Sequence, residues 1–385
     1  MLEREAMAVL VSTQSVSYGK REAAIHCAGS ALEVVKHPNT YALILGEEGA
    51  AAVAYRANRA AELLLKMEKT GVRMIARGEA EYPSRLAATA RPPHVLFVRG
   101  AGICDEQAVA VVGTRRASAY GLRHTRRIAA ELAAAGVCVA SGLALGIDAA
   151  AHEGALDAGG RTIAVLGSGH DKMTPAVNRT LMDRIIACGG SVVTEYPPGV
   201  PATRYSFLER NRIIAGLCQG VLVTEGARRS GALSTANHAL DEGRDVFALP
   251  GDIDRVSAQL PNMLIAEGAA PVGSGAEILA YLSVVHIDIG RPEKKRRQNA
   301  REAEPAEAGG QTGREMPNPA APARGNTSEA GPEKQISDLL LAGDMDFDQL
   351  SERTGIESDD LGAILMMMEL DGLIEALPGL LYRHA

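Results

Sequence analysis

The sequence has no tryptophan, and aromatic residues make up only 3% of its 385 residues. A folded core must therefore rest on aliphatic side chains, which bring the hydrophobic share to 46%. No segment approaches the run of about 18 apolar residues that a membrane-spanning helix needs. The first ten residues, MLEREAMAVL, include acidic side chains and no long apolar run, unlike a secretory signal peptide. These absences predict a cytoplasmic protein without a membrane segment.

The five cysteines are scattered, with no CxxC pair and no regular spacing: Cys27, Cys104, Cys138, Cys188 and Cys218. Structural metal sites and disulfide frameworks need cysteines at characteristic spacings. The distribution therefore favours buried free thiols in a reducing compartment. Elsewhere no metal-ligand spacing appears, and no nucleophile stands beside an obvious base. We therefore expect no metal, no other cofactor and no catalytic residue.

The net charge of −7 is unevenly distributed along the chain. Residues 333–385 contain twelve acidic and three basic side chains, a net charge of −9. Residues 1–332 therefore carry about +2, since the whole chain carries −7. The acidic tail thus accounts for the negative net charge of the chain. The remaining residues are nearly neutral overall, and local basic clusters among them can still attract a polyanion.

Composition divides the chain into three blocks and a linker. Residues 1–70 predict a small, mainly helical domain, a degenerate form of the SAM or helix-hairpin-helix type, in which 56–71 reads as one helix ending at a glycine. Residues 71–285 predict an extended Rossmann-like domain, whose first strands are VRMIA and HVLFV. Residues 286–332 are charged and rich in Pro, Gly and Ala, which predicts a disordered linker. Residues 333–385 show three short helical stretches and a closing hairpin, the pattern of a winged helix.

The middle block repeats a short Val-rich run, a glycine-rich turn and a helix. The runs predicted to be strands are 108–112, 137–140, 162–166, 191–195, 220–225 and 245–249. Such runs are typical of strands buried on both faces of a parallel sheet. The fold class is therefore α/β, a Rossmann-like doubly wound and mostly parallel sheet, flanked by a helical N-terminal domain and a C-terminal winged-helix domain.

The turns after these strands should carry the function, because ligands bind at the carboxyl ends of such sheets. The turns include GTRRASAYG, SGLALGID, GSGHDKMTP and EGARRSGALSTA. Their glycines allow close backbone approach, and their amides, hydroxyls and arginines suit an anion. A dinucleotide does not fit, because the first turn lacks G-x-G-x-x-G and places Arg115 and Arg116 where a pyrophosphate would meet bare backbone. The turns predict a polyanionic ligand.

Several polar residues near these turns have structural explanations as well as functional ones. Asp148 and His152 are expected to cap and pack the second helix of this block. Glu195 and Glu225, at strand ends, are expected to bond loop amides rather than to act as acids or bases. His238 is expected to be a core residue.

At these turns the sequence resembles the DNA-processing protein A family (DprA, also called Smf). The resemblance is carried by EYPSRL with RPPHVLFVRG, VVGTRRASAYG, SGLALGIDAAAHEGAL, TIAVLGSG, FLERNRIIAGL and SGALSTANHALDEGRDVFALPG. It implies a homodimeric protein, not an enzyme, that binds single-stranded DNA, protects incoming strands during natural transformation and helps to load the RecA recombinase.

The resemblance also implies a DNA site. Arg115 corresponds to a phosphate-contacting arginine. The expected DNA-binding set is Gly113, Thr114, Arg115, Ser118, Ser141, Gly142, Ser168, Gly169, Lys172, Arg210, Asn211 and Arg212. Thr174 replaces a tyrosine usual in the family, so a stacking contact worth ~1–3 kcal/mol per base is in doubt. The acidic tail should be repelled by phosphates and is interpreted as a protein-contact module.

Two other functions remain open. A phosphoribohydrolase on a related Rossmann platform would carry a GGxxGxxxE-type pattern, which RSGALSTANHALDEG matches only incompletely. A non-catalytic protein scaffold would use the glycine-rich turns only for packing.

Overall fold

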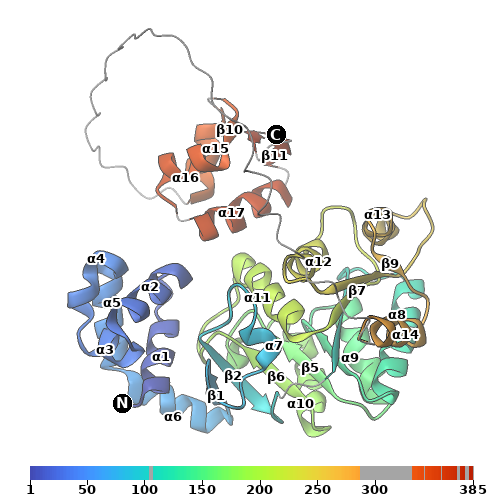
Figure 1. The fold of residues 1–385 in the computed structure, drawn as a ribbon, viewed down its shortest axis with the longest axis horizontal. Coiled ribbons are helices and arrows are strands. Elements are labelled where there is room, and N and C mark those ends of the chain that lie inside the picture. The colour runs from blue at the N-terminus through green and yellow to red at the C-terminus, as the bar shows by residue number, and fades with distance from the viewer. Residues whose placement is uncertain are drawn as a thin grey trace, which may run out of the picture.

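The computed structural model describes residues 1–103, 107–286, 332–341, 343–356, 358–370, 373–377 and 381–384. Figure 1 shows N-terminal helices in blue, a central α/β domain in cyan to orange, and a C-terminal module in red near α11 and α12. The expected linker lies, apart from its two end residues, outside the described residues. No helix among the described residues is both long and apolar enough to cross a membrane.

The central domain is built on a nine-stranded sheet in the order β1-β2-β6-β5-β4-β3-β7-β8-β9. The strands are β1 (Arg73–Ala76), β2 (Val95–Gly100), β3 (Ala108–Val112), β4 (Cys138–Ser141), β5 (Thr162–Val165), β6 (Ser191–Thr194), β7 (Gly220–Val223), β8 (Asp245–Ala248) and β9 (Ala270–Pro271). From β6 to β9 all neighbours are parallel, whereas β2 runs antiparallel to both β1 and β6. The predicted doubly wound, mostly parallel α/β fold is confirmed.

The strand order reverses at β3, which lies between β4 and β7. After β3 the chain winds outward through β4, β5 and β6, and then returns to place β7, β8 and β9 on the other side. A reversal of this kind opens a crevice outside the carboxyl ends of the central strands, because the adjoining helices go to opposite faces.

Helices cover both faces of the sheet. They are α7 (Ser84–Ala87), α8 (Ala119–Ala134), α9 (Ile147–Asp157), α10 (Arg179–Ala187), α11 (Arg204–Leu217), α12 (Gly231–Asp241), α13 (Gln259–Ala266) and α14 (Gly275–His286). One face buries side chains of α7, α11, α12 and α13, and the other those of α8, α9 and α14. In α8 the buried positions Thr125, Ile128, Ala129 and Leu132 follow helical spacing, so one stripe of the helix faces the sheet.

The N-terminal domain packs its helices against the β1–β2 hairpin. They are α1 (Glu3–Ser12), α2 (Tyr18–Ala28), α3 (Ala31–Lys36), α4 (Ala42–Leu45), α5 (Glu47–Ala57) and α6 (Ala60–Thr70), with a 3₁₀ turn at Pro38–Tyr41. The single helix expected over 56–71 is wrong, because the backbone leaves the helix at Asn58 and Arg59 before α6 begins. Val95 and Phe97 of β2 belong to the helical core, whereas Leu96 and Val98 face the core of the central domain.

The C-terminal module contains α15 (Pro332–Leu341), α16 (Phe347–Thr354) and α17 (Ser358–Leu370). A three-stranded antiparallel sheet of β10 (Met345–Asp346), β12 (Leu381–His384) and β11 (Ile374–Leu377) completes it. This arrangement agrees with the predicted winged helix.

The cysteines are only partly as expected. Cys138 and Cys218 are buried free thiols, but Cys27 and Cys188 are exposed, since they lie on or next to the solvent side of helix ends. Cys104 lies outside the described residues.

Candidate functional site

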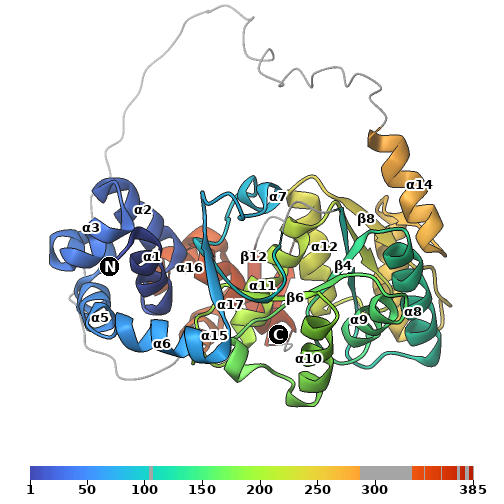
Figure 2. The same cartoon turned by 90° about the horizontal axis from the view of Figure 1, so that it is seen from below.

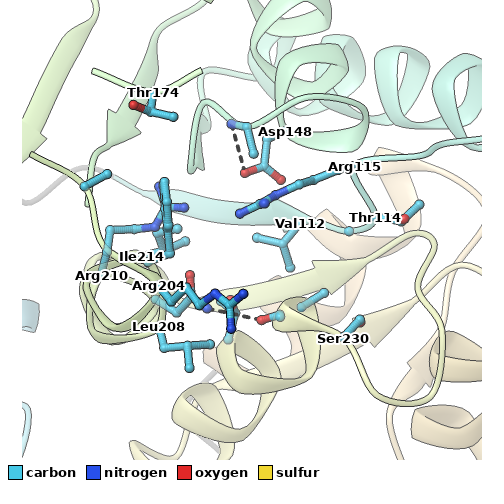
Figure 3. A pocket seen from close by; sticks show the side chains of 18 of the residues that line it. Val112, Thr114, Arg115, Asp148, Thr174, Arg204, Leu208, Arg210, Ile214 and Ser230 are labelled. Atoms are coloured by element: carbon cyan, nitrogen blue, oxygen red, sulfur yellow. Dashed lines mark hydrogen bonds between the residues drawn. The ribbon is translucent and has the colours of Figure 1, made fainter. Parts of the chain in front are cut away.

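A groove of about 710 Å³ opens where the strand order reverses (Figure 3). Its walls come from the turn after β3, the turn after β4, one face of α11 and the start of α12. Four cations line it, namely Arg115, Arg116, Arg204 and Arg210, whereas Asp148 is the acidic lining residue among those described. The groove therefore carries a positive charge at the place where a doubly wound sheet binds its ligand.

Arg115 is one of three exposed cations in the groove lining, with Arg116 and Arg204. Its guanidinium reaches over the cavity in Figure 3, and its Cζ lies 5.3 Å from the ring centroid of Phe207 on α11. A guanidinium held against an aromatic face keeps its donors directed outward. Arg115 can therefore bind an anion that enters the groove.

Arg210 supports the groove from beneath and is only 4% exposed. Its Nη1 donates to the Gly142 carbonyl oxygen at 2.6 Å and also to the Val165 carbonyl oxygen. Burial lowers its pKa to about 10, whereas the neighbouring Asp148 carboxylate favours the charged form. Arg210 thus ties the turn after β4 to α11 while remaining cationic.

Several backbone amides of these turns, including that of Gly142, already have hydrogen-bond partners. The Gly142 amide donates to Oδ2 of Asp148 at 3.1 Å, and the Ala144 amide donates to the same oxygen at 3.4 Å. The Thr114 amide bonds the Glu225 carbonyl oxygen at 2.7 Å, and the Gly169 amide bonds the Val200 carbonyl oxygen at 2.9 Å. These amides stabilise the turns, so side chains must provide most of the contacts to an anion.

Glu225 fixes the first turn, as its structural interpretation predicted. Its carboxylate accepts from the Ser118 amide at 2.8 Å, the Ser118 hydroxyl at 2.5 Å and the Ser257 hydroxyl at 3.2 Å. Ser118 also caps α8 by accepting from the Gly121 amide. The carboxylate therefore has structural partners and does not face the groove.

The structure brings five of the twelve expected site residues to the groove lining: Gly113, Thr114, Arg115, Arg210 and Asn211. Ser141, Gly142, Ser168 and Gly169 are buried, and the Ser141 hydroxyl donates to the Val111 carbonyl oxygen. Lys172 is exposed but does not line the groove, although Thr174 two residues later does.

Arg212 is not in the groove, contrary to the expectation that it widens the positive surface there. It lies on the other face of α11, 9% exposed, where its guanidinium pairs with Glu195 and also lies 3.6 Å from Glu209. Two residues of a helix differ by about 200° in direction, so Arg210 and Arg212 cannot share one face.

Sequence reasoning missed Phe207 and Arg204 as lining residues. Both precede Arg210 on α11, and helical spacing places Phe207 three positions earlier on the same face. This three-residue spacing within FLERNR could have predicted that Phe207 lies on the same face of the helix as Arg210.

The winged-helix module lies beside the groove. Met367 of α17 is one of its lining residues, and α11 and α17 are in contact. At the rim, Arg229 lies 3.7 Å from Glu369, and the Tyr205 hydroxyl bonds Glu333 at the start of α15. Acidic side chains of the tail therefore stand next to the basic groove, and Figure 2 shows α17 beside α11.

The fold and the groove define a Rossmann-like protein with a positively charged groove and an appended winged helix. Residues 73–283 match the family described as DNA recombination-mediator protein A, and residues 317–379 match the DprA winged helix domain. Because the first match covers more than half of the chain, this protein belongs to the DNA recombination-mediator protein A (DprA) family. The resemblance found in the sequence is thereby confirmed.

Two relatives and one solved structure show the extent of the similarity. Protein Smf of Synechocystis is 36% identical over 318 residues, covering 80% of this chain and 78% of the relative. Protein Smf of Escherichia coli is 44% identical over 217 residues, but the match covers only 58% of that relative. The X-ray structure of DprA from Streptococcus pneumoniae superimposes with a TM-score of 0.61 at 34% identity, covering 71% of this chain and 95% of that one.

Proposed function

We propose that this protein binds single-stranded DNA in the groove, with Arg115 contacting a phosphate and Phe207 offering a surface for a base. The observation that carries the proposal is the exposed Arg115 guanidinium, held 5.3 Å above the Phe207 ring in a cavity of about 710 Å³. A cation beside an aromatic ring suits a single strand, which presents phosphates and unpaired bases together. Contacts to phosphates carry no sequence information, so binding should be largely independent of sequence.

The lining favours binding over catalysis. Asp148 is buried, its carboxylate accepts two amide hydrogen bonds, and burial raises its pKa. A phosphoribohydrolase would need a carboxylate facing its substrate, whereas Asp148 is committed to the turn after β4. Of the twelve predicted residues, those such as Thr114, Arg115 and Asn211 then serve as contacts and buried ones such as Arg210 as supports, whereas Lys172 and Arg212 lie outside the groove lining.

Family membership extends the proposal. We infer that the bound strand is incoming DNA during natural transformation in the cytoplasm, that the protein protects it, and that a homodimer helps to load RecA. These roles rest on the family alone.

Fluorescence anisotropy of labelled oligo-dT and of a matching duplex, over a salt series, tests the groove. Arg115→Ala should weaken strand binding about 10- to 100-fold, because a hydrogen bond to a charged group contributes about 1.5–3 kcal/mol. The log–log salt slope should also fall by about 0.7. Arg123→Ala, an exposed arginine of α8 that does not line the groove, is the matched control. No strand binding by the wild type at low salt contradicts the proposal, and release of base from nucleoside monophosphates would then support the hydrolase.

A further inference from the structure

A second cavity of about 580 Å³ lies on the far side of the first turn of α11. Thr203, the N-cap of α11, lines both this cavity and the groove. The other walls come from α2, the turn after β6 and the winged-helix module, which contributes Ile356 and Ile364. We call this cavity the side pocket. The side pocket adjoins the groove at Thr203.

The side pocket has a surplus of positive charge. Four cations line it, namely Lys20, Arg21, Arg91 and Arg212, against the carboxylates of Glu195 and Glu209. Arg212 pairs with Glu195, and Arg91 lies 3.2 Å from Glu209. The lining therefore contains two more cations than carboxylates. Apolar walls lower the local dielectric constant, which strengthens the attraction for an anion.

Arg21 is the lining cation whose Nε has no hydrogen-bonding partner among the described residues. That nitrogen is inaccessible to water, although the residue as a whole is only partly buried. Burial lowers the pKa of Arg21, whereas Glu195 acts in the opposite sense. A desolvated cation without a hydrogen-bonding partner costs stability unless an anion completes the site.

An aromatic ring stands beside these cations. The Tyr18 ring on α2 has Cζ of Arg91 at 5.3 Å and Cζ of Arg212 at 6.0 Å, and its hydroxyl bonds the Pro92 carbonyl oxygen at 3.1 Å. Tyr18 is therefore fixed in place, as Phe207 is beside Arg115 in the groove. Both cavities therefore place an aromatic ring against arginine side chains.

We propose that the side pocket is a second phosphate site, which takes a phosphate of the same single strand after it leaves the groove. This inference rests on the proposed function of the groove. The strand would cross the first turn of α11, where Thr203 borders both cavities and Arg204 is exposed. The helix dipole favours phosphate at this end of α11. Arg21 would then bind the phosphate that reaches the pocket.

The test compares Arg21→Gln with the wild type over a series of oligo-dT strands from about four to about 16 nucleotides, the range of common single-strand site sizes. Short strands that fill only the groove should bind both proteins equally. Longer strands should bind Arg21→Gln about 5- to 20-fold more weakly, with a salt slope lower by about 0.7. Arg21→Lys should restore most of the lost affinity, and Lys36→Ala, an exposed change in the same domain, should bind as the wild type does.

Thermal unfolding separates this function from a structural role. Because Arg21 is a partly buried cation whose Nε has no partner, its replacement should leave the melting temperature unchanged or raise it by about 2–4 °C, although long-strand affinity falls. A lower melting temperature of Arg21→Gln would mean that Arg21 supports the fold, which overturns the proposal.

Other outcomes also overturn it. Equal affinities of Arg21→Gln and wild type at every length contradict the second site, and an equal loss at every length means that Arg21 acts on the groove itself. If Arg21→Gln changes only the affinity for free thymidine monophosphate, the pocket holds a nucleotide rather than a continuing strand. Failure of the wild type to bind any strand contradicts the proposed function and this inference with it, whereas the other outcomes leave the groove intact.

Discussion

The two faces of α11 carry the same kind of side chain in contrasting surroundings. Arg210 faces the groove and Arg212 the side pocket, and both are at least nine-tenths buried. Arg210 donates to the carbonyl oxygens of Gly142 and Val165, whereas Arg212 pairs with Glu195 and lies near Glu209. The comparison shows that the acceptor determines how much positive charge a buried arginine contributes to a cavity. Carbonyl oxygens satisfy its hydrogen-bond donors and leave its charge, whereas carboxylates satisfy the donors and also neutralise the charge.

The same contrast separates the two cavities. The groove keeps a surplus of positive charge because four arginines line it and Asp148 is the one carboxylate among the described lining residues. In the side pocket, Arg91 and Arg212 pair with Glu209 and Glu195. The attraction of this pocket for an anion therefore depends on its other cations, Arg21 in particular. Counting the arginines does not distinguish these two cavities, whereas the acceptors that the arginines contact do.

Replacement of the two buried arginines gives the largest expected effects. Arg210→Ala and Arg212→Ala should each lower the free energy of unfolding by roughly 3–5 kcal/mol, because each leaves buried acceptors or a carboxylate without a partner. Only Arg210→Ala should also weaken binding of short strands, since it supports the turn beside the groove. Urea unfolding and anisotropy measure the two quantities. If Arg212→Ala lost as much short-strand affinity as Arg210→Ala, the two faces of α11 would not differ in function as described.

Gly142→Ala tests how tightly Arg210 is held. A Cβ at this position would overlap the Arg210 guanidinium, whereas a Cβ at Gly231, a residue of the groove lining, meets nothing within 4 Å. Gly142→Ala should therefore lower the free energy of unfolding by about 1–3 kcal/mol and weaken strand binding. Gly231→Ala is the matched control and should change stability little. Similar stabilities of the two variants would show that Arg210 moves freely.

Glu369→Gln should have the smallest effect. Glu369 lies 3.7 Å from Arg229 at the rim of the groove, and both side chains are partly exposed, at 29% and 55%. An exposed pair contributes about 0–1 kcal/mol, so removal of this charge should tighten strand binding by no more than about 5-fold. Glu352→Gln, an exposed acidic position on α16, removes the same charge elsewhere and should bind as the wild type does. Weaker binding by Glu369→Gln would mean that the tail assists the strand.

Much of the fold could be predicted from the sequence because the strands are short, Val-rich and separated by glycine turns. The strand predicted at 108–112 has the bounds of β3, and the other five central strands begin or end within a residue or two of their predicted bounds. Alternation of strands and helices then required a parallel sheet with its site at the carboxyl ends. Arg115 was predicted in the groove for the same reason, since it follows β3 directly.

Other features depend on partners that the sequence does not reveal. Glycine turns predicted free amides at Gly142 and Gly169, but Asp148 and the Val200 carbonyl oxygen occupy them. The position of the tail beside α11 depends on a contact such as Tyr205–Glu333, between segments more than a hundred residues apart. By contrast, the opposite directions of Arg210 and Arg212 were available from helical spacing alone.

The β1–β2 hairpin has a consequence for how the protein opens. Its alternate side chains enter two cores, Val95 and Phe97 on one face and Leu96 and Val98 on the other. Backbone amides of a segment shared in this way exchange hydrogen only when both cores separate, so the N-terminal helices and the sheet should exchange as one cooperative unit. Local fluctuation would then be confined to the turns and rims, and the angle between α2 and α11 would be set by the fold and not by a hinge.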